Sequence, residues 1–319
     1  GVPLRSRIVA NFTALSKAGA LFPALYNLIM TGKLTAGITK RIAGFAPRRS
    51  MPPLYHITLK HWYNRRKRQP LKKSTGKVYL FCDEFTNYND TETGIKAVLL
   101  LERLGYEVII PEHIESGRSW LSKGLLRNAK KIAEKNVKLL LPLISEQTPL
   151  VGVEPSAILT FRDEYIDLAD DAMLEETKRL SANVFTIDEF LSREADVEKI
   201  TDAMFTKKER KIVFHGHCHQ KALSSVAPSV KLLSLPQNYS VQVIPSGCCG
   251  MAGSFGYEKE HYDLSMQIGE LVLLPAVRRQ SEDVIIAAPG TSCRHQIKDG
   301  ASRKALHPVE ILYDALADG

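Results

Sequence analysis

The chain has 319 residues, of which 44% are apolar, enough to bury a large core and to form two domains. No apolar run reaches the roughly 20 residues that a helix needs to cross a bilayer. The five cysteines come without a secretory signal, which is typical of a reducing compartment where thiols stay free to bind metal. We therefore expect a cytoplasmic protein, soluble or at most peripheral at the inner membrane face.

The net charge of +8 hides a strong asymmetry along the chain. Residues 1–76, here called the basic arm, contain fifteen Lys and Arg and no acidic residue, which leaves 28 basic and 35 acidic residues in the rest. A basic arm on an acidic body favours an anionic partner, either a neighbouring domain or a membrane surface. The densest run, 65–68 with Lys72 and Lys73, has no recognition motif beside it, so nucleic acid is not expected. A solvated linker between domains is the simpler alternative.

The first 50 residues place apolar groups at helical spacing between Lys and Arg, with breaks at Gly19, Pro23, Gly32 and Gly44. This pattern predicts short amphipathic helices whose apolar faces need cover from the rest of the protein or from lipid headgroups. Prolines and the basic run then predict an irregular connection to residue 76. The basic arm is thus expected to be a mostly helical arm or linker.

From residue 77 the pattern becomes that of an α/β protein. Short apolar runs of strand type alternate with longer stretches of helical periodicity. The first half predicts strands over 78–82, 108–110 and 150–153 and helices over 92–104, 122–140, 164–180 and 187–200. The second half predicts strands over 211–214, 241–244 and 284–288 and a helical run over 257–279.

The second half repeats the first. Residues 106–117 align without a gap with residues 239–250. This predicts two tandem, pseudo-symmetric α/β units with short parallel sheets, one over 77–205 and one over 206–319, packed about a pseudo-twofold axis.

The first copy has lost the cysteines of the second. Cys82 and Ala157 are separated by 75 positions, as are Cys218 and Cys293, and the segment 115–117 reads Glu-Ser-Gly where the second copy has Cys-Cys-Gly. We therefore expect the first unit to keep the fold without its ligands, and Cys82 to be an inert thiol.

Four of the five cysteines follow the three predicted strands of the second half. In a parallel sheet the loops after the strands gather at one edge, where ligands bind. Thiolates that converge there form a soft site that selects zinc, copper(I) or an iron-sulfur cluster. The candidate metal ligands are Cys218, Cys248, Cys249 and Cys293.

An iron-sulfur cluster, most simply of the [4Fe-4S] type, suits these cysteines better than zinc. A zinc ribbon would show two close Cys-x-x-Cys pairs, whereas here the spacings are long and Cys248 and Cys249 are adjacent. Gly250 and Gly253 would let backbone N–H groups approach a sulfide, and the run 257–279 would point its N-terminus at the site. Zinc is the alternative occupant. Adjacent cysteines do not easily reach one centre, so one of the pair could lie outside the ligand set.

Four histidines flank the cysteines. We expect His217 and His219 above all, with His215 and His295, to donate N–H groups to the cluster or to shuttle protons, without being ligands themselves. Hydrogen bonds to backbone carbonyls are the alternative, and direct ligation ranks last. No residue that would oxidise a substrate is identified, and no Gly-x-Gly-x-x-Gly pattern marks a flavin site in these residues.

The order Cys, then Cys-Cys-Gly, then Cys resembles the cysteine-rich CCG domain that occurs in heterodisulfide reductase and in anaerobic glycerol-3-phosphate dehydrogenase. Further motifs resemble the C-terminal part of bacterial FAD-linked iron-sulfur oxidoreductases that act on D-2-hydroxy acids such as D-lactate, glycolate or D-2-hydroxyglutarate. The motifs are Phe85-Thr-Asn-Tyr88, Ser122-Lys-Gly-Leu125, Glu154-Pro-Ser156, Arg162-Asp-Glu164, His215-Gly-His-Cys-His-Gln220 and the segment 246–257.

This resemblance implies an oxidoreductase that is part of a larger polypeptide. The flavin module with its FAD, and a ferredoxin-like module before residue 1, would lie outside this chain. The cysteine site would pass electrons from flavin to an acceptor, a quinone or another redox protein. Two alternatives stay open: a zinc-binding structural or interaction domain, and a docking module that uses the basic arm at a membrane surface.

Overall fold

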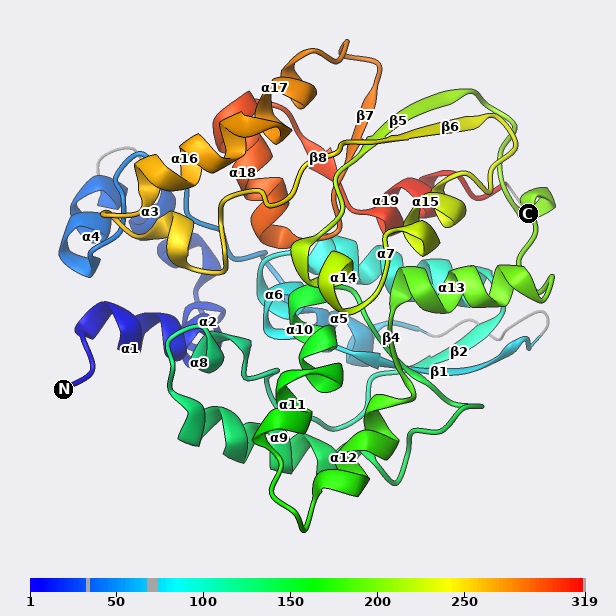
Figure 1. Ribbon diagram of the computed structural model, residues 1–319, viewed down its shortest axis with the longest axis horizontal. Helices are drawn as coiled ribbons and strands as arrows, with labels where there is room; N and C mark the ends of the chain where they lie inside the picture. The colour runs from blue at the N-terminus through cyan, green and yellow to red at the C-terminus, as the bar shows by residue number, and fades with distance from the viewer. Residues whose placement is uncertain (33–34, 68–73, 318–319) are drawn as a thin grey trace.

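The computed structural model describes residues 1–32, 35–67 and 74–317, so Arg68, Lys72 and Lys73 of the densest basic run lie outside the described residues. It contains two four-stranded parallel sheets (Figure 1). The first has the order β2-β1-β3-β4 and the second the order β6-β5-β7-β8. The strands are β1 (Gly76–Phe81), β2 (Tyr106–Ile109), β3 (Leu150–Gly152), β4 (Val184–Thr186), β5 (Arg210–Phe214), β6 (Tyr239–Val243), β7 (Ile285–Ala287) and β8 (Ala305–Leu306).

The two sheets have the same topology, which confirms the predicted fold class of two tandem α/β units. In each, the second strand pairs on one side of the first and the third on its other side, and the fourth pairs with the third. Gly76 is in register with Tyr106 in the first sheet, and Arg210 with Tyr239 in the second. The two tyrosines are the residues that the sequence repeat equates. We call the part built on β1–β4 the first unit and the part built on β5–β8 the second unit.

Helices cover both faces of each sheet, as parallel sheets require. The first unit contains α6 (Glu84–Tyr88), α7 (Thr91–Arg103), α8 (Arg118–Leu121), α9 (Leu126–Leu140), α10 (Pro155–Ile158), η1 (Leu159–Arg162), α11 (Glu164–Leu168), α12 (Leu174–Ser181), α13 (Ile187–Asp196) and η2 (Asp202–Met204). The second contains α14 (Cys218–Leu223), α15 (Ala227–Leu233), η3 (Phe255–Tyr257), α16 (Tyr262–Leu271), α17 (Leu273–Arg278), α18 (Thr291–Ala301) and α19 (Pro308–Asp314).

The two units share one hydrophobic core. Figure 1 shows α7, α13, α15 and α19 between the two sheets. Helix α7 of the first unit packs on α19 of the second, and α15 of the second packs on α13 of the first, so the two contacts are related by the pseudo-twofold. The buried cluster between the sheets joins Val78 and Leu80 to Phe214 and Val309.

The basic arm is folded against both units. Its helices are α1 (Leu4–Ala10), α2 (Phe12–Gly19), α3 (Pro23–Thr31), α4 (Thr35–Ala43) and α5 (Leu59–Arg65). Arg49 is fully buried, and it donates hydrogen bonds to Gly256 O at 2.9 Å and to Gln296 Oε1 at 2.7 Å in the second unit. Tyr63 donates to Val108 O in the first unit. The described part of the arm is therefore a packed layer and not only a connection.

Many large apolar side chains on the arm are nevertheless exposed, and several stand in or beside α3 and α4. No helix among the described residues is both long and apolar enough to cross a membrane. The exposed residues of the arm are Val2, Leu4, Leu15, Leu21, Phe22, Leu25, Leu28, Ile29, Ile38 and Ile42.

Some predicted elements are interrupted in the structure. The helix predicted over 122–140 begins at Leu126, because Gly124 takes a positive φ of 67° after the short helix α8. The run over 257–279 divides into α16 and α17 at Val272, whose φ and ψ of −144° and −50° lie outside the helical range. Strands β4 and β8 are three and two residues long, too short to show a period in the sequence.

Candidate metal centre

All four candidate cysteines meet at the carboxyl edge of the second sheet. Cys218 is the first residue of α14, Cys248 and Cys249 lie in the loop after β6, and Cys293 is in the first turn of α18. Cys218 and Cys249 lie close enough to shift the pKa of Cys248, and Cys248 and Cys293 that of Cys249. The sulfurs of Cys249 and Cys293 lie within 4.8 Å of each other. Both members of the adjacent pair are therefore in the group.

The thiols share protons because they cannot all ionise together. Hydrogen bonds from neighbouring thiols lower the pKa of Cys248 and of Cys293, whereas donation to those thiolates raises the pKa of Cys218 and of Cys249. A bound metal would replace these protons and let every thiol act as a thiolate ligand. Cys249 and Cys293 are buried, and Cys218 is exposed, so the group is open on one side.

His215 adds a nitrogen to the buried side of the group. One of its ring nitrogens and the thiols of Cys249 and Cys293 lie within 4.8 Å of one another. Nδ1 is hydrogen-bonded to Ser246 Oγ at 2.7 Å, and Nε2 is buried with no partner among the described residues other than the Cys293 thiol, whose pKa His215 helps to lower. An unpartnered buried nitrogen is costly unless something binds it. We call these four cysteines and His215 the cysteine site.

Sequence reasoning gave more weight to His217 and His219 than to His215. His217 caps α14, where its Nδ1 accepts a hydrogen bond from the backbone N–H of His219 at 3.2 Å. Burial, and next to it the charge of Arg118, lowers the pKa of His219 to about 4, and its Nδ1 is also unpartnered among the described residues. The signal for His215 was its place immediately after the last residue of β5, which puts it at the sheet edge.

The two predicted glycines act differently in the structure. The backbone N–H of Gly250 donates to Cys248 Sγ at 3.3 Å, as expected for an amide beside a metal-binding sulfur. Its positive φ of 92°, and the 2.2 Å that would separate a Cβ from Ser265 O, explain why glycine is needed there. Gly253 also has a positive φ but lies against Ser122 of the first unit.

The helix expected to point at the cysteines does not do so. Helix α16 packs its middle against the Cys249–Gly250 backbone, since a Cβ on Gly269 would lie 3.3 Å from Cys249 O. The helices that begin at the site are α14 and α18. The expectation failed because the residues before α16 form the short helix η3 and turns, which displace the start of α16 to Tyr262.

In the first unit a carboxylate occupies the corresponding place. Helix α6 begins at Glu84 as α14 begins at Cys218, so Glu84, and not Cys82, corresponds to Cys218 in the fold. Glu84 accepts hydrogen bonds from Ser116 N at 3.0 Å and from Ser116 Oγ at 2.6 Å. Ser116 is the residue that the repeat equates with Cys249. Glu84 and Ser116, hydrogen-bonded to each other, thus fill the place in the first unit that corresponds to the cysteines of the second unit.

Cys82 is buried and lies apart from this pair. Its thiol contacts Asn87 Oδ1, and its backbone N–H donates to His113 Nε2 at 3.2 Å. Desolvation raises the pKa of the thiol well above its usual range. These surroundings support the expectation of an inert thiol.

The charged residues near the cysteines hold backbone in place. Lys221 donates to the carbonyls of Ser246 and Gly247, which fixes the loop carrying Cys248. Arg294 forms an ion pair with Asp90 of the first unit. Arg162, from the Arg-Asp-Glu motif, pairs with Glu189.

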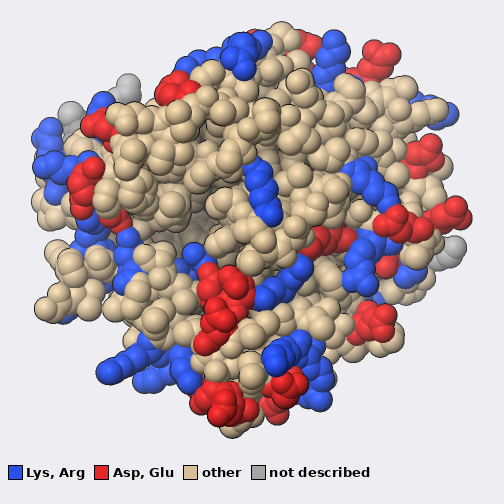
Figure 2. All heavy atoms as spheres, viewed as in Figure 1, with Lys and Arg blue, Asp and Glu red and all other residues tan. Residues whose placement is uncertain are grey.

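The surface of the molecule has a hollow on the face drawn in Figure 2. Figure 2 shows this hollow on the face of Figure 1, between the loop that precedes α16 and helices α6 and α14. Basic and acidic side chains stand on its rim. Cys218 is exposed on α14, so the cysteine site is open to the solvent on that side.

The known proteins that the chain resembles in sequence include dehydrogenases. No family model matches the chain. D-2-hydroxyglutarate dehydrogenase of Escherichia coli is 27% identical over 322 residues, which are 98% of this chain and 31% of the relative. The chain is similar to the C-terminal part of that dehydrogenase. It therefore spans about a third of the length of such relatives.

Two shorter relatives match larger shares of their own length. One subunit of the anaerobic glycerol-3-phosphate dehydrogenase of Escherichia coli is 23% identical over 98% of this chain and 78% of its own. Lactate utilization protein A of Bacillus licheniformis is 29% identical over 75% of this chain and 97% of its own. The predicted resemblance is confirmed, since the chain is similar over nearly its whole length to parts of dehydrogenases.

The cysteine site suits a metal or an iron-sulfur cluster. Four cysteines from neighbouring loops converge here and provide soft anionic ligands, and a ring nitrogen of His215 lies within 4.8 Å of the thiols of Cys249 and Cys293. When bound, a cluster would supply one-electron transfer. The chain's own residues would supply the ligands, the N–H of Gly250 and the burial that sets the potential.

Proposed function

We propose that the second unit holds one iron-sulfur cluster, most simply [4Fe-4S], on Cys218, Cys248, Cys249 and Cys293. The observation that supports this most is that the four cysteines converge at the starts of α14 and α18 and in the loop after β6, with the sulfurs of Cys249 and Cys293 within 4.8 Å of each other. The first unit offers a single cysteine, so one complete four-cysteine set is the most that the chain can form.

The proposed role is electron transfer within a larger FAD-linked oxidoreductase. Relatives named D-2-hydroxyglutarate dehydrogenase and lactate utilization protein A support a D-2-hydroxy acid of the lactate, glycolate or 2-hydroxyglutarate type as the substrate. The flavin domain would oxidise it, and the cluster would pass electrons to a quinone or a redox protein. The exposed side of the site at Cys218 gives such an acceptor a short path for the electron.

His217, His219 and Gly250 would tune the cluster without binding it. Gly250 already donates its N–H to a ligand sulfur. His217 and His219 stand on either side of Cys218 at the start of α14. Amide and imidazole N–H groups near cluster sulfur raise its potential, because they stabilise the added negative charge of the reduced state. We also propose Gly253 as a residue that shapes this loop.

The proposal also includes a division into three domains and a location in the cell. The arm over 1–76, the first unit over 77–205 and the second over 206–319 would be the domains, joined to ferredoxin-like and flavin domains of the same polypeptide. We place the protein in the cytoplasm, with the exposed apolar residues of the basic arm in contact with the inner membrane face. The arm's lack of acidic residues supports an anionic surface.

Metal and sulfide analysis of protein reconstituted without oxygen tests the cluster. About four irons and four acid-labile sulfides per chain are expected, with visible absorption that bleaches on reduction and an EPR signal from the reduced protein. Iron-free protein that retains zinc would contradict the proposal.

A structural zinc site is the second candidate. It is favoured by the buried nitrogen of His215 beside Cys249 and Cys293, because a mixed set of thiolate and imidazole ligands is typical of zinc. Zinc would give no visible absorption and no redox activity, so the same sample separates the two candidates.

A further inference from the structure

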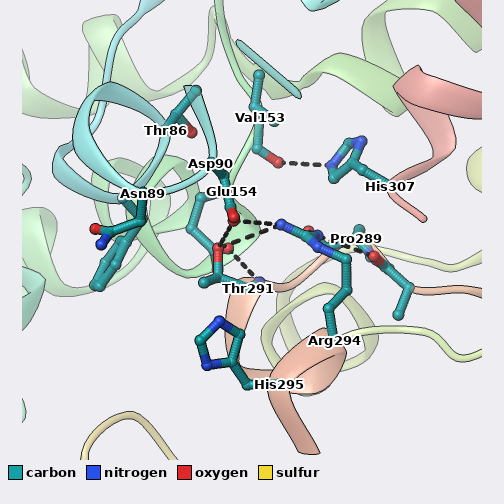
Figure 3. Close-up of polar contacts among 12 residues, drawn as sticks. Thr86, Asn89, Asp90, Val153, Glu154, Pro289, Thr291, Arg294, His295 and His307 are labelled. Carbon is teal, nitrogen blue, oxygen red and sulfur yellow. Dashed lines mark hydrogen bonds and ion pairs between the residues drawn. The ribbon is translucent and has the colours of Figure 1, made fainter. Parts of the chain in front are cut away.

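The helix that carries Cys293 is held by the first unit. Figure 3 shows Asp90 and Glu154, both from the first unit, grouped around Thr291 and Arg294 of α18. Asp90 accepts a hydrogen bond from Thr291 Oγ1 at 2.5 Å and pairs with Arg294. These contacts bracket Cys293, which lies between Thr291 and Arg294 in the first turn.

Glu154 caps two helices, one in each unit. Its Oε1 accepts from Ser156 N at 3.1 Å and from Ser156 Oγ at 2.7 Å, which caps its own helix α10. Its Oε2 accepts from Thr291 N at 2.8 Å, at the start of α18. Both oxygens of this buried carboxylate are therefore used.

Helix α18 needs a cap from elsewhere because it has no room for its own. The N-cap residue is Gly290, which has no side chain to offer. A Cβ at this position would lie 2.4 Å from His217 Cδ2 and 3.3 Å from Cys293 Sγ. Close packing around the cysteine site thus excludes Ser, Thr, Asp and Asn, the usual capping residues.

Arg294 connects the first turn of α18 to the residues that follow β7 through hydrogen bonds. Its Nη1 donates to Ala288 O at 3.0 Å and to Pro289 O at 2.7 Å, while Nη2 donates to Asp90. Burial alone would raise the pKa of Asp90, but Arg294 and the Thr291 hydroxyl hold that pKa below its usual range. The carboxylate is therefore ionised and keeps the guanidinium in place.

We propose that Glu154 and Asp90 are positioning residues for Cys293, so that the unit without cysteine ligands fixes a ligand helix of the unit that has them. This inference rests on the proposed function, because it takes Cys293 to be a cluster ligand. Its consequence is that metal binding in the second unit depends on the contact between the units.

The test uses thiol labelling of the metal-free protein and a redox titration of the reconstituted protein. In Glu154→Ala and Asp90→Ala, Cys293 should react with N-ethylmaleimide at least about tenfold faster than in the parent, because the first turn of α18 is no longer held. Peptide mass spectrometry locates the label. Cys82, buried in the first unit, should stay protected and so shows that the variants are folded.

Glu154→Gln separates position from charge. With its NH2 turned to Ser156 Oγ, which can accept, the amide oxygen can still accept the Thr291 N–H, so Cys293 should stay protected and iron content should equal the parent's. Only the bond from Ser156 N is lost. The reduction potential should become more positive, because a nearby negative charge that opposes reduction has been removed. Asp314→Asn is the matched control, since Asp314 pairs with Lys96 at the exposed rim of the interface between the units and should change neither readout.

The outcomes distinguish this inference from the proposed function. Unchanged labelling of Cys293 in both alanine variants would overturn the inference even if the parent binds a full cluster. Faster labelling in a protein that takes up only zinc would support the inference and refute the cluster. A potential that shifts equally in Glu154→Gln and Glu154→Ala, with Cys293 protected in both, would mean that Glu154 acts through charge alone.

Discussion

At the scale of single residues, the cysteines divide into a reactive group and one isolated thiol. Cys249→Ser or Cys293→Ser should remove the cluster or reduce its iron content, because the sulfurs of these two buried residues lie within 4.8 Å of each other, where both can bind it. Cys82→Ser should retain the parent's iron and sulfide. Metal analysis and EPR of the three proteins check this, and equal loss in all three would disprove the account of a ligand-free first unit.

His307 should make the protein sensitive to acid. Its Nδ1 accepts from Val309 N at 3.0 Å and caps α19, and its Nε2 is bonded to Val153 O of the first unit at 3.2 Å. Burial, and next to it the charge of Arg294, lowers its pKa to about 3 from an ordinary 6.5. Between these values the unfolded chain binds a proton that the folded protein does not, so stability falls as the pH falls through this window.

The expected contribution of this one proton is about 1.4 kcal/mol for each pH unit in the window. In His307→Asn the side chain can still cap α19 but cannot titrate. The slope of unfolding free energy against pH, from urea melts between pH 6 and 4.5, should therefore be smaller in the variant by about one proton. Parallel slopes would show that His307 is not the group responsible.

The sequence predicts more of the cysteine site than of the contacts that hold its residues in place. The four cysteines each follow a short apolar strand, so the sheet edge where they meet could be inferred from pattern alone. The equal spacing of 75 paired Cys82 with Cys218, whereas the helix starts pair Glu84 with Cys218, because the starts of α6 and α10 are 71 residues apart and those of α14 and α18 are 73 residues apart. Asp90 and Glu154 lie more than 130 positions from α18, and no local pattern reports such a contact.

At the scale of elements, the connection between α4 and α5 is fixed by one buried guanidinium. Arg49 donates to Gly256 and Gln296, and it pairs with Asp299 at 3.3 Å. Arg49→Ala removes the ion pair with Asp299 and leaves Gly256 O and Gln296 Oε1 without the hydrogen bonds that Arg49 donates, and breaking a buried pair in this way costs about 3–5 kcal/mol of stability. Chemical denaturation should show this loss as a lower midpoint.

Arg48 is the matched control for this variant. It precedes Arg49 and pairs with Asp263, but both side chains are mostly exposed. Exposed pairs contribute about 0–1 kcal/mol, so Arg48→Ala should unfold close to the parent's midpoint. If the two variants unfolded alike, Arg49 would not be the residue that fixes the arm.

At the scale of the whole molecule, the arm combines charge with exposed apolar groups. Residues 1–76 contain fifteen Lys and Arg and no acidic residue. The same residues include Leu21 and Phe22, which are 74% and 69% exposed. An anionic bilayer satisfies both features, because it attracts the cations and takes up the apolar side chains. The protein should therefore bind vesicles that contain phosphatidylglycerol, and salt should release it.

The double variant Leu21→Ser and Phe22→Ser should weaken this binding by at least about tenfold, since burial of one such side chain is worth about 1.5–3 kcal/mol. Leu271→Ser is the control, because Leu271 is equally exposed but lies on α16 outside the arm. Sedimentation with vesicles of rising phosphatidylglycerol content measures the affinity. Equal binding to neutral vesicles, or equal loss in the control, would contradict the membrane contact and favour a protein partner for the arm's apolar face.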